Sequence, residues 1–397
     1  MGRKTAAIFP VLALVVLLAG SSPAEPTQAP EVDMRRISFS PDGAEAPLSG
    51  SSERARLTLD SPLQRTASRL LARANPVAGS VVAVDVPTGR VLVWSERRRS
   101  SGQPGSVLLD TQAPAASLFK IVTTAALLEK AGIPPATRVC AKGAQHSIER
   151  EHLDPPARGD SALCAPFGQA LGHSRNAVFA QLATRHLLRA DLQDMADQFG
   201  FNGPLPFVGS LPMGTVSLPY NDLEFARAAA GFVGSELSPL GALSLAYVVA
   251  AGGQAVQLEV VAEAGEYRAP KRRRVVGRVM SAWTARQLRR MMEVTVHSGT
   301  SLEAFSDPKG QSYLGGIRVA GKTGTLQPSA TAPTTSWFVG FAPSRHPKIV
   351  VSVLLQNGKV WRRKANEVAR DLLRAYFADR GWRGVTHPLP SASPSSQ

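Results

Sequence analysis

The stretch APAASLFKIVTTAALLEKAG, residues 113–132, constrains the fold more than any other part of the chain. It predicts a helix in which nearly every position after Lys120 is apolar, with Thr123 and Thr124 as mild polar breaks. A helix that is apolar on all sides has to lie inside a core. The chain must therefore build a core around this helix, and that core meets the two polar side chains at its start, Ser117 and Lys120.

Ser117 and Lys120 are three positions apart, so a helix presents the serine hydroxyl and the lysine amine on one face. Burial and the positive end of the helix dipole both favour the uncharged amine, which makes Lys120 a candidate base for Ser117. The alternative is an ordinary capping serine followed by a lysine that extends to solvent. Because Ser306 and Lys309 repeat the spacing in a polar, proline-containing stretch, the spacing alone does not decide between these interpretations.

The first residues of the chain predict export. Two basic residues precede an apolar run over residues 8–19, and small residues that offer a cleavage site follow, which is the layout of a secretory signal peptide. The uncharged stretch over residues 5–24 is about 20 residues long, which also suffices to cross a bilayer as an uncleaved anchor. Residues 1–24 are therefore expected to be a signal peptide or a membrane anchor.

Cys140 and Cys164 are the only cysteines of the chain. In an exported protein, two cysteines in one local segment predict a disulfide. A metal site is less favoured, because His146 and His152 lie nearby without a recognised ligand spacing. The sequence indicates neither a metal nor a cofactor.

The net charge of +15 first suggests nucleic acid as a partner. The sequence has neither zinc-finger spacing nor an RNA-binding aromatic signature, and its densest basic run, residues 271–274, is short and follows a proline. We therefore expect no nucleic acid partner. A basic exterior equally favours an anionic membrane surface or an anionic cell-wall polymer.

The order of elements predicts the fold class. Residues 25–57 are rich in Pro, Ser, Ala and Gly and are expected to be a flexible linker, residues 58–385 a single folded domain, and residues 386–397 a disordered tail. The domain's predicted elements are a helix that begins at Ser61, a β-hairpin over 79–94, helices in the middle that include 177–188 and 284–296, strands at 317–320, 335–341 and 349–355, and a helix between 360 and 380. This order predicts an α+β fold: a five-stranded antiparallel sheet flanked by N- and C-terminal helices, with an inserted helical subdomain.

Residues 316–323, GIRVAGKT, match the phosphate-binding pattern GxxxxGK[ST] letter by letter. The context excludes a P-loop, because the four interior residues form strands and no helix can start at Gly324, Thr325 and Pro328. The segment is better interpreted as a strand that ends in Lys322 and presents a cation and backbone donors to a site. Upstream, Ser174-Arg175-Asn176 precedes a helix and supplies a hydroxyl and an amide, although alone Ser174 would be an ordinary helix cap.

Three short motifs thus occur in one order: SLFK at 117–120, SRN at 174–176 and KTG at 322–324. This pattern resembles the penicillin-recognising serine acyltransferases, meaning penicillin-binding proteins and serine β-lactamases, with their SxxK, SxN and KTG motifs. The resemblance covers about residues 79–379 and includes GSVVAVDVPTGRVLVW before the serine and TSWFVGFAP after KTG. It implies a penicillin-binding/β-lactamase-like fold.

The resemblance also implies a role for each motif residue. Ser117 would attack a peptide carbonyl, Lys120 would take its proton, and Ser174 would pass that proton to the leaving amine. Asn176 would hold the substrate amide. The substrate-binding strand would comprise Lys322, Thr323, Gly324 and Thr325, with the lysine and both threonines binding the terminal carboxylate and the N–H groups of Ser117 and Thr325 forming an oxyanion hole.

Members of this family join peptidoglycan stem peptides, remove their terminal D-alanine, or destroy β-lactams. No ExxLN segment of a class A β-lactamase lies between Asn176 and Lys322, and an asparagine at 176 argues against class D. The WFVGFAP segment resembles the transpeptidase domain of larger penicillin-binding proteins, which favours a D,D-transpeptidase that acts on D-Ala-D-Ala stem peptides. The resemblance implies that β-lactams acylate the protein. It also implies a location outside the cytoplasm, in the periplasm or on the outer face of the inner membrane.

Two departures leave alternatives open. No large pedestal domain and no glycosyltransferase domain precedes the helix at Ser61, and GFVGSE at 231–236 stands where many relatives have a Gly-Gln-Gly turn. A free-standing D,D-carboxypeptidase is therefore the second hypothesis. A non-catalytic penicillin or peptidoglycan sensor, which would be acylated without turnover, is the third.

Overall fold

The computed structural model describes residues 2, 29–99, 105–157, 162–205, 211–327 and 329–388. The predicted signal peptide or anchor, apart from Gly2, and most of the predicted tail lie outside the described residues. Within the described ranges, no helix is both long and apolar enough to span a membrane.

A five-stranded antiparallel sheet in the order β15-β16-β17-β4-β5 forms the centre of the molecule. Its strands are β4 (Ala78–Asp85), β5 (Val91–Arg98), β15 (Ala320–Leu326), β16 (Thr334–Ala342) and β17 (Ile349–Asn357). The last strand of the chain, β17, pairs with the hairpin near the N-terminus, because it lies directly beside β4. The predicted sheet and α+β fold class are confirmed, and β15, the strand that carries KTG, lies at one edge of the sheet.

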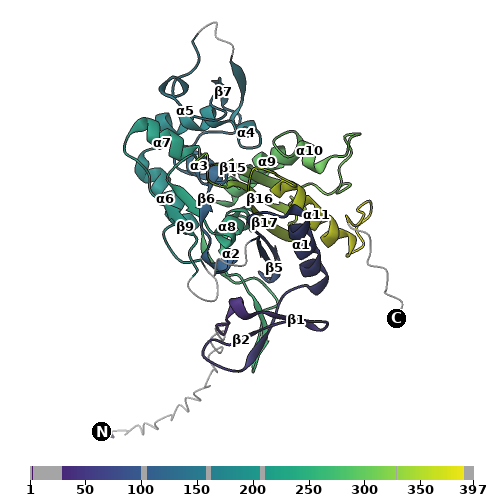
Figure 1. Cartoon of the computed structure of the whole chain (residues 1–397). Helices are drawn as coiled ribbons and strands as arrows, with labels where there is room; N and C mark the ends of the chain where they lie inside the picture. The colour runs from purple at the N-terminus through teal and green to yellow at the C-terminus, as the bar shows by residue number, and fades with distance from the viewer. Residues whose placement is uncertain are drawn as a thin grey trace.

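Two helices from opposite ends of the chain cover one face of this sheet (Figure 1). They are α1 (Ser61–Ala74) and α11 (Ala365–Ala378), and their apolar faces share one core with side chains of the sheet. The side chain of Asp60 caps α1 by accepting a hydrogen bond of 3.0 Å from the backbone N–H of Leu63. Both flanking helices begin and end within the regions where the sequence predicts them.

The other face packs against helices of the middle of the chain, which form the predicted inserted subdomain. The apolar helix α8 (Pro239–Ala250) contacts β16 and β17 directly. The remaining helices are α2 (Val107–Asp110), α3 (Lys120–Glu129), α4 (Phe167–Ala170), α5 (Asn176–His186), α6 (Arg189–Phe199), α7 (Asp222–Ala229), α9 (Ala282–His297) and α10 (Leu302–Phe305), with 3-10 turns η1 (Met34–Arg36), η2 (Ala116–Leu118) and η3 (Arg150–His152). The buried helix α3 packs against the helices α5, α6 and α9 of this region.

Short strands add three small sheets to this region. The strands are β6 (Ala113–Pro114), β9 (Gly214–Val216) and β10 (Ser235–Leu237) in one sheet, β7 (Arg138–Ala141) and β8 (Leu163–Pro166) in a second, and β11 (Gln254–Val256) and β14 (Val275–Arg278) in a third. Cys140 and Cys164 are opposite each other in the β7–β8 hairpin and are joined by a disulfide, the pairing expected from the sequence.

The prediction of a flexible linker over residues 25–57 is wrong for residues 29–57. This segment forms β1 (Ser38–Ser40), β2 (Gly43–Pro47) and β3 (Arg54–Leu57), which join β12 (Val261–Ala264) and β13 (Tyr267–Arg268) in a second five-stranded sheet. Its buried side chains are mainly alanines, including Ala44, Ala46 and Ala55, so composition conceals the core. The sheet lies at the opposite end of the molecule from the β7–β8 hairpin (Figure 1).

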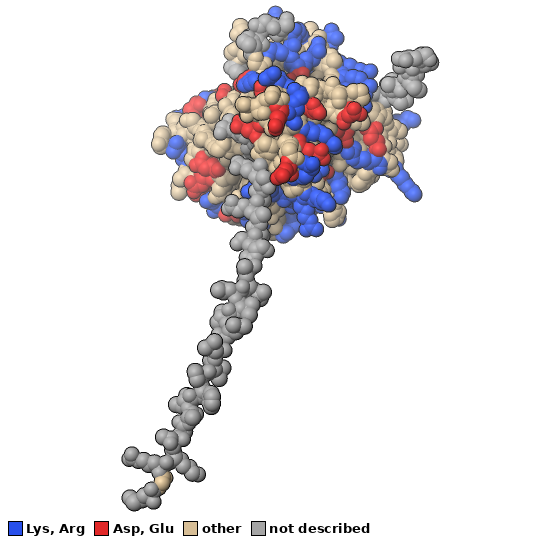
Figure 2. All heavy atoms as spheres, turned by 90° about the horizontal axis from the view of Figure 1, so that it is seen from below, with Lys and Arg blue, Asp and Glu red and all other residues tan. Residues whose placement is uncertain are grey.

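Basic and acidic side chains are mixed on the face of the molecule that Figure 2 shows. In Figure 2, Lys and Arg are spread over the visible face with Asp and Glu between them. Many of the described arginines form surface ion pairs, for example Arg54 with Glu45 and Arg185 with Asp154. This distribution differs from the basic groove or stripe typical of a nucleic-acid-binding surface.

Replacing both Cys140 and Cys164 by serine should lower the free energy of unfolding by about 3 kcal/mol, because the bond closes a loop between positions 24 apart. Urea denaturation of the wild type with and without a reductant measures the same difference. A midpoint that is unchanged in both experiments would show that the bond does not contribute to stability.

Candidate active site

Ser117 lies in the 3-10 turn η2, immediately before α3 begins at Lys120. The preceding residue, Ala116, has a φ of +49°, a backbone conformation that non-glycine residues seldom adopt. A second chain segment touches this turn, since a Cβ on Gly231 would lie 2.0 Å from the carbonyl oxygen of Ala116. Only glycine therefore fits at position 231, and the turn is held from outside as well as by its own helix.

The Lys120 side chain is completely buried and lies against Ser117. Its Nζ is 2.8 Å from the Ser117 Oγ and donates a hydrogen bond of 2.5 Å to the carbonyl oxygen of Ala230. The structure thus places the first predicted pair within hydrogen-bond distance. The interpretation of Lys120 as a lysine that extends to solvent is excluded.

A second lysine–serine pair lies across the same cleft. The Nζ of Lys322, also completely buried, is 3.0 Å from the Ser174 Oγ and donates a hydrogen bond of 2.8 Å to the carbonyl oxygen of Thr323. Ser174 has a φ of +53° and precedes α5. The alternative interpretation of Ser174 as a helix cap is wrong, because Arg175 occupies the N-cap of α5. The Ser174 hydroxyl instead joins the helical region to the edge strand β15.

Burial changes the protonation of both lysines. Desolvation lowers the pKa of Lys120 well below its ordinary value, and the charge of Lys322 lowers it further. Desolvation also lowers the pKa of Lys322, to about 7. An uncharged Lys120 amine can accept a proton from Ser117, whereas Lys322 retains positive charge near and below neutral pH.

Asn176 is the first residue of α5 and is held by the loop that follows β7. Its Nδ2 donates hydrogen bonds of 2.6 Å to the carbonyl oxygen of Ala144 and 3.0 Å to that of Gln145. These bonds fix the amide plane at the entrance of the cleft.

Strand β15 presents alternate side chains to its two faces. Lys322 and Gly324 face the serine turn, where a Cβ on Gly324 would lie 3.4 Å from atoms of Ala115, Ala116 and Leu118. Thr323 and Thr325 therefore face the opposite side, and the Oγ1 of Thr323 is 2.7 Å from the Oγ1 of Thr300. The absence of a side chain at Gly324 allows the strand to approach the turn of Ser117 closely.

These groups border one cleft of about 410 Å³. Its lining residues are Ala116, Ser117, Gln145, Ser174, Asn176, Ala230, Gly231, Phe232, Thr300, Thr323, Thr325, Leu326, Ser336, Trp337, Trp361, Lys364 and Asn366. Five predicted site residues line it directly, and the two buried lysines support serines that do. The structure therefore brings all three motifs together.

Sequence reasoning missed the side of the cleft formed by Thr300 and by residues near the start of α11. Asn366 is 6% exposed, its Nδ2 donates a hydrogen bond of 3.1 Å to the Ser301 Oγ, and its Oδ1 has no partner among the described residues. Lys364 also lines this side and forms no ion pair within the described ranges. Nothing in the local sequence pattern marks either residue.

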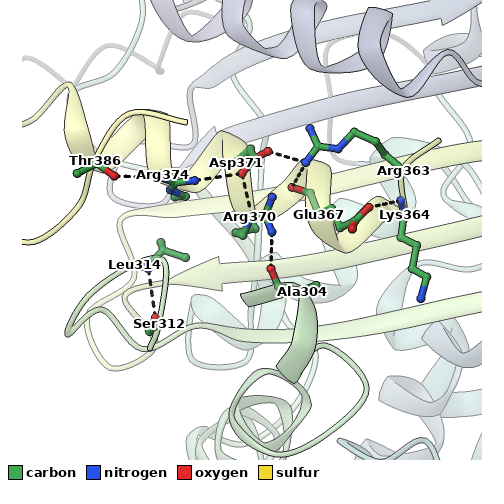
Figure 3. Close-up of polar contacts among 10 residues, drawn as sticks. All are labelled: Ala304, Ser312, Leu314, Arg363, Lys364, Glu367, Arg370, Asp371, Arg374 and Thr386. Atoms are coloured by element: carbon green, nitrogen blue, oxygen red, sulfur yellow. Dashed lines mark hydrogen bonds and ion pairs between the residues drawn. The ribbon is translucent and has the colours of Figure 1, made fainter. Parts of the chain in front are cut away.

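Figure 3 shows that the Lys364 side chain takes no part in the ion-pair cluster around Asp371. Its neighbour Arg363 turns toward Asp371 and pairs with it at 2.5 Å, as does Arg370 at 2.8 Å, whereas the Lys364 side chain extends away from this cluster. The cluster fixes the first turns of α11, and Lys364 lines the cleft that Thr323 and Thr325 also line.

The chemistry of the cleft is that of an activated serine beside an anion-binding strand. Within the part of the chain that the structure describes, no three His, Cys, Asp or Glu side chains are grouped so that they could hold a metal ion. The arrangement suits nucleophilic attack on a carbonyl, with a proton acceptor at Lys120 and a hydroxyl relay at Ser174.

Replacing Lys322 by Met should flatten the pH dependence of stability. The unfolded chain keeps this proton up to about pH 10.5, whereas the folded protein loses it at about pH 7. Between these values the unfolded state binds more protons, so raising the pH stabilises the fold, and the variant should lose a slope of about 1.4 kcal/mol per pH unit. Denaturant titrations from pH 7 to 10 measure the slope. Equal slopes in both proteins would contradict a buried, deprotonating Lys322.

Comparisons with known proteins agree with this geometry. A family model described as the penicillin binding protein transpeptidase domain matches residues 79–376. The peptidoglycan D,D-transpeptidase PbpA of Mycobacterium tuberculosis (strain H37Rv) is 26% identical over 323 residues, covering 71% of this chain and 62% of that protein. The probable peptidoglycan D,D-transpeptidase PbpC of Pseudomonas aeruginosa is 25% identical over 333 residues, covering 77% and 55%. The chain thus spans about 62% of the length of the PbpA relative.

Solved structures share the fold. PBPA from Mycobacterium tuberculosis superposes with a TM-score of 0.66 at 22% identity, covering 81% of this chain and 82% of that chain. The D,D-transpeptidase domain of a peptidoglycan glycosyltransferase from Eggerthella lenta reaches a TM-score of 0.68 at 22% identity, covering 87% and 90%. Solved structures of the M. tuberculosis protein include imipenem and penicillin G acyl-enzyme complexes.

Proposed function

Because the chain belongs to the penicillin-binding protein transpeptidase family, we propose that it is a D,D-transpeptidase that cross-links peptidoglycan stem peptides through an acyl-enzyme. The observation that carries this proposal is the pair of buried lysines, each within 3.0 Å of a serine hydroxyl on the same cleft. The protein acts outside the cytoplasm, in the periplasm or on the outer face of the inner membrane. Membrane attachment through residues 1–24 stays a prediction from the sequence.

Acylation begins when the Ser117 Oγ attacks the carbonyl carbon between the two terminal D-alanines. Lys120 takes the serine proton, since its amine is buried and its pKa is lowered. A C–O bond to Ser117 forms and the peptide C–N bond breaks. Ser174 delivers a proton to the departing amine of D-alanine, and Lys322, 3.0 Å from its hydroxyl, stabilises the oxygen as the proton moves.

Substrate binding uses both faces of β15. The strand pairs with the acyl part of the stem peptide. The Asn176 Oδ1 accepts a hydrogen bond from an N–H of that peptide, because its Nδ2 already donates to the carbonyl oxygens of Ala144 and Gln145. The terminal carboxylate lies near Thr323 and Thr325, in the field of the buried Lys322. Lys364 supplies a second cation to the cleft, which no acidic residue lines in the part of the chain that the structure describes.

Replacing Ser117 by Ala should abolish covalent labelling by fluorescent penicillin, because no other residue forms the ester. Ser306 offers a matched control, since it is followed by a lysine at the same spacing but does not line the cleft. Ser306→Ala should be labelled at the wild-type rate in a gel assay. Labelling that persists in Ser117→Ala would contradict the assignment of Ser117 as the nucleophile.

The fate of the acyl-enzyme separates the three hypotheses for this family. Purified protein is incubated with a stem peptide ending in D-Ala-D-Ala, with and without a peptide that carries a free amine. We expect a joined dimer together with free D-alanine, detected by mass spectrometry. Free D-alanine without a dimer would indicate a carboxypeptidase, and penicillin labelling with neither product would indicate a sensor.

Replacing Lys364 by Gln should slow acylation by a carboxylate-bearing β-lactam about fivefold, the loss expected for one exposed ion pair. The methyl ester of the same compound should react equally with both proteins, because it has no charge for the lysine to attract. Stopped-flow measurements of acylation give both rates. Arg362→Gln, an exposed neighbour outside the cleft, is the control. An equal loss of acylation rate with the methyl ester would show that Lys364 supports the fold rather than binding the carboxylate.

A further inference from the structure

A second cavity, of about 680 Å³, adjoins the cleft at Ser174. The cleft and the cavity share Gln145, Ser174 and Asn176 in their linings, so the cavity begins where the cleft ends. Its far wall is the β7–β8 hairpin, in which the Cys140–Cys164 disulfide joins the two strands. The mechanism of acylation described above makes no use of this space.

The lining of the cavity is basic. Lys142, His173 and Arg175 all face it, and none of the Asp and Glu side chains that the structure describes lines it. Desolvation and the charge of Arg175 lower the pKa of His173, so at neutral pH the positive charge on this wall comes from Lys142 and Arg175 rather than from the imidazole. The cavity therefore favours a ligand that carries a negative charge.

Arg175 has unused capacity to bind. The Nε of its guanidinium is buried and has no hydrogen-bond partner among the described residues, and the guanidinium forms no ion pair with any of them. An unpaired, half-buried guanidinium costs free energy in the empty protein. A carboxylate matches its planar donors, so a carboxylate is the group that this wall fits best.

The location of the cavity next to Ser174 indicates which kind of molecule it binds. Aminolysis of the acyl-enzyme is the reverse of acylation by an amide, so the attacking amine must approach from the side where the leaving amine departed. That side is marked by Ser174, the hydroxyl that hands a proton to the leaving amine. A cavity that opens at Ser174 lies on the path of the incoming amine.

We propose that this cavity is the acceptor site: it binds an anionic peptide that bears a primary amine, with a carboxylate of that peptide on Arg175. The proposal rests on the transpeptidase function proposed above and names the binding site of its second substrate. It places the amine beside Ser174 and the rest of the acceptor along the β7–β8 hairpin, outside the space filled by the acyl group.

The chemical step at this site balances as follows. The uncharged acceptor amine attacks the ester carbonyl carbon, a C–N bond forms, and the C–O bond to Ser117 breaks. The amine loses one proton, which passes through the Ser174 hydroxyl and Lys120 to the Ser117 Oγ and restores its hydroxyl. Arg175 takes no part in the proton transfer and acts as a binding residue.

The test measures how the acyl-enzyme divides between joining and hydrolysis. The full chain is given a D-Ala-D-Ala donor and one of two acceptors: an amine-bearing stem peptide with a free carboxylate, or the same peptide with that carboxylate amidated. In Arg175→Gln the ratio of joined to hydrolysed product should fall about tenfold with the carboxylate acceptor, the loss of one charge-assisted bond, and stay unchanged with the amide. Acylation by penicillin should match the wild type. Arg286→Gln, an exposed residue of α9 that does not line the cavity, is the control.

Ala162→Trp provides a second variant, because Ala162 is a half-exposed residue of the cavity lining and a large ring there fills the space without a change in charge. It should lower the joining ratio for both acceptors and leave penicillin labelling intact. If the ratio of joined to hydrolysed product were unchanged in both variants, the acceptor site would be wrong, although the protein would still form an acyl-enzyme. A loss of penicillin acylation in Arg175→Gln would also overturn it, since the residue would then hold Ser174 and Asn176 in place. A wild type that penicillin does not label would instead contradict the proposed function itself.

Discussion

Two lysine amines buried in one protein, each touching a serine hydroxyl, are the constraint on which the site depends. Among the described residues neither amine has a carboxylate partner, and both are held by backbone carbonyl oxygens, those of Ala230 and Thr323. Burying two like charges this way is unfavourable, and the protein avoids the full cost because Lys120 gives up its proton. Desolvation of the Lys120 amine, together with its repulsion by Lys322, thus produces the base that a serine nucleophile needs.

The junction between sheet and helices is built to bring these amines together. The turn of Ser117 is enclosed between Gly231 on one side and Gly324 on the other, and a side chain at either position would collide with the turn or crowd it. Ala116 and Ser174 both adopt left-handed backbone conformations, which cost free energy that the surrounding core has to supply. Strain and close backbone approach are concentrated at the two serines that the chemistry uses.

Much of the fold and of the site could be predicted from the sequence, because the signals lie in short stretches of the chain. The apolar helix after Lys120, the β-branched runs of the central sheet and the three motifs are patterns that short windows of sequence reveal. Residues 29–57 were misjudged because their strands depend on β12, more than two hundred residues away, and because alanines fill their core. Thr300, Lys364 and Asn366 could not be found, since only the folded chain places the end of α9 and the start of α11 beside β15. Ser117 was predicted on a helix face, but it lies in a 3-10 turn, because the helix proper starts only at Lys120.

The pairing of β17 with β4 has a consequence for how the molecule is assembled. The first hairpin of the central sheet is complete by Arg98, yet the strand that covers its open edge begins at Ile349. The whole segment between these two strands has to be synthesised before that edge can pair. In the same way, β3 cannot pair with β12 until β12 has been synthesised. Contacts of such large sequence separation form slowly. A nascent chain of this protein therefore exposes unpaired strand edges until nearly its last helix has been synthesised. Completion of the chain, rather than formation of a local nucleus, is then the step that commits the protein to its native structure.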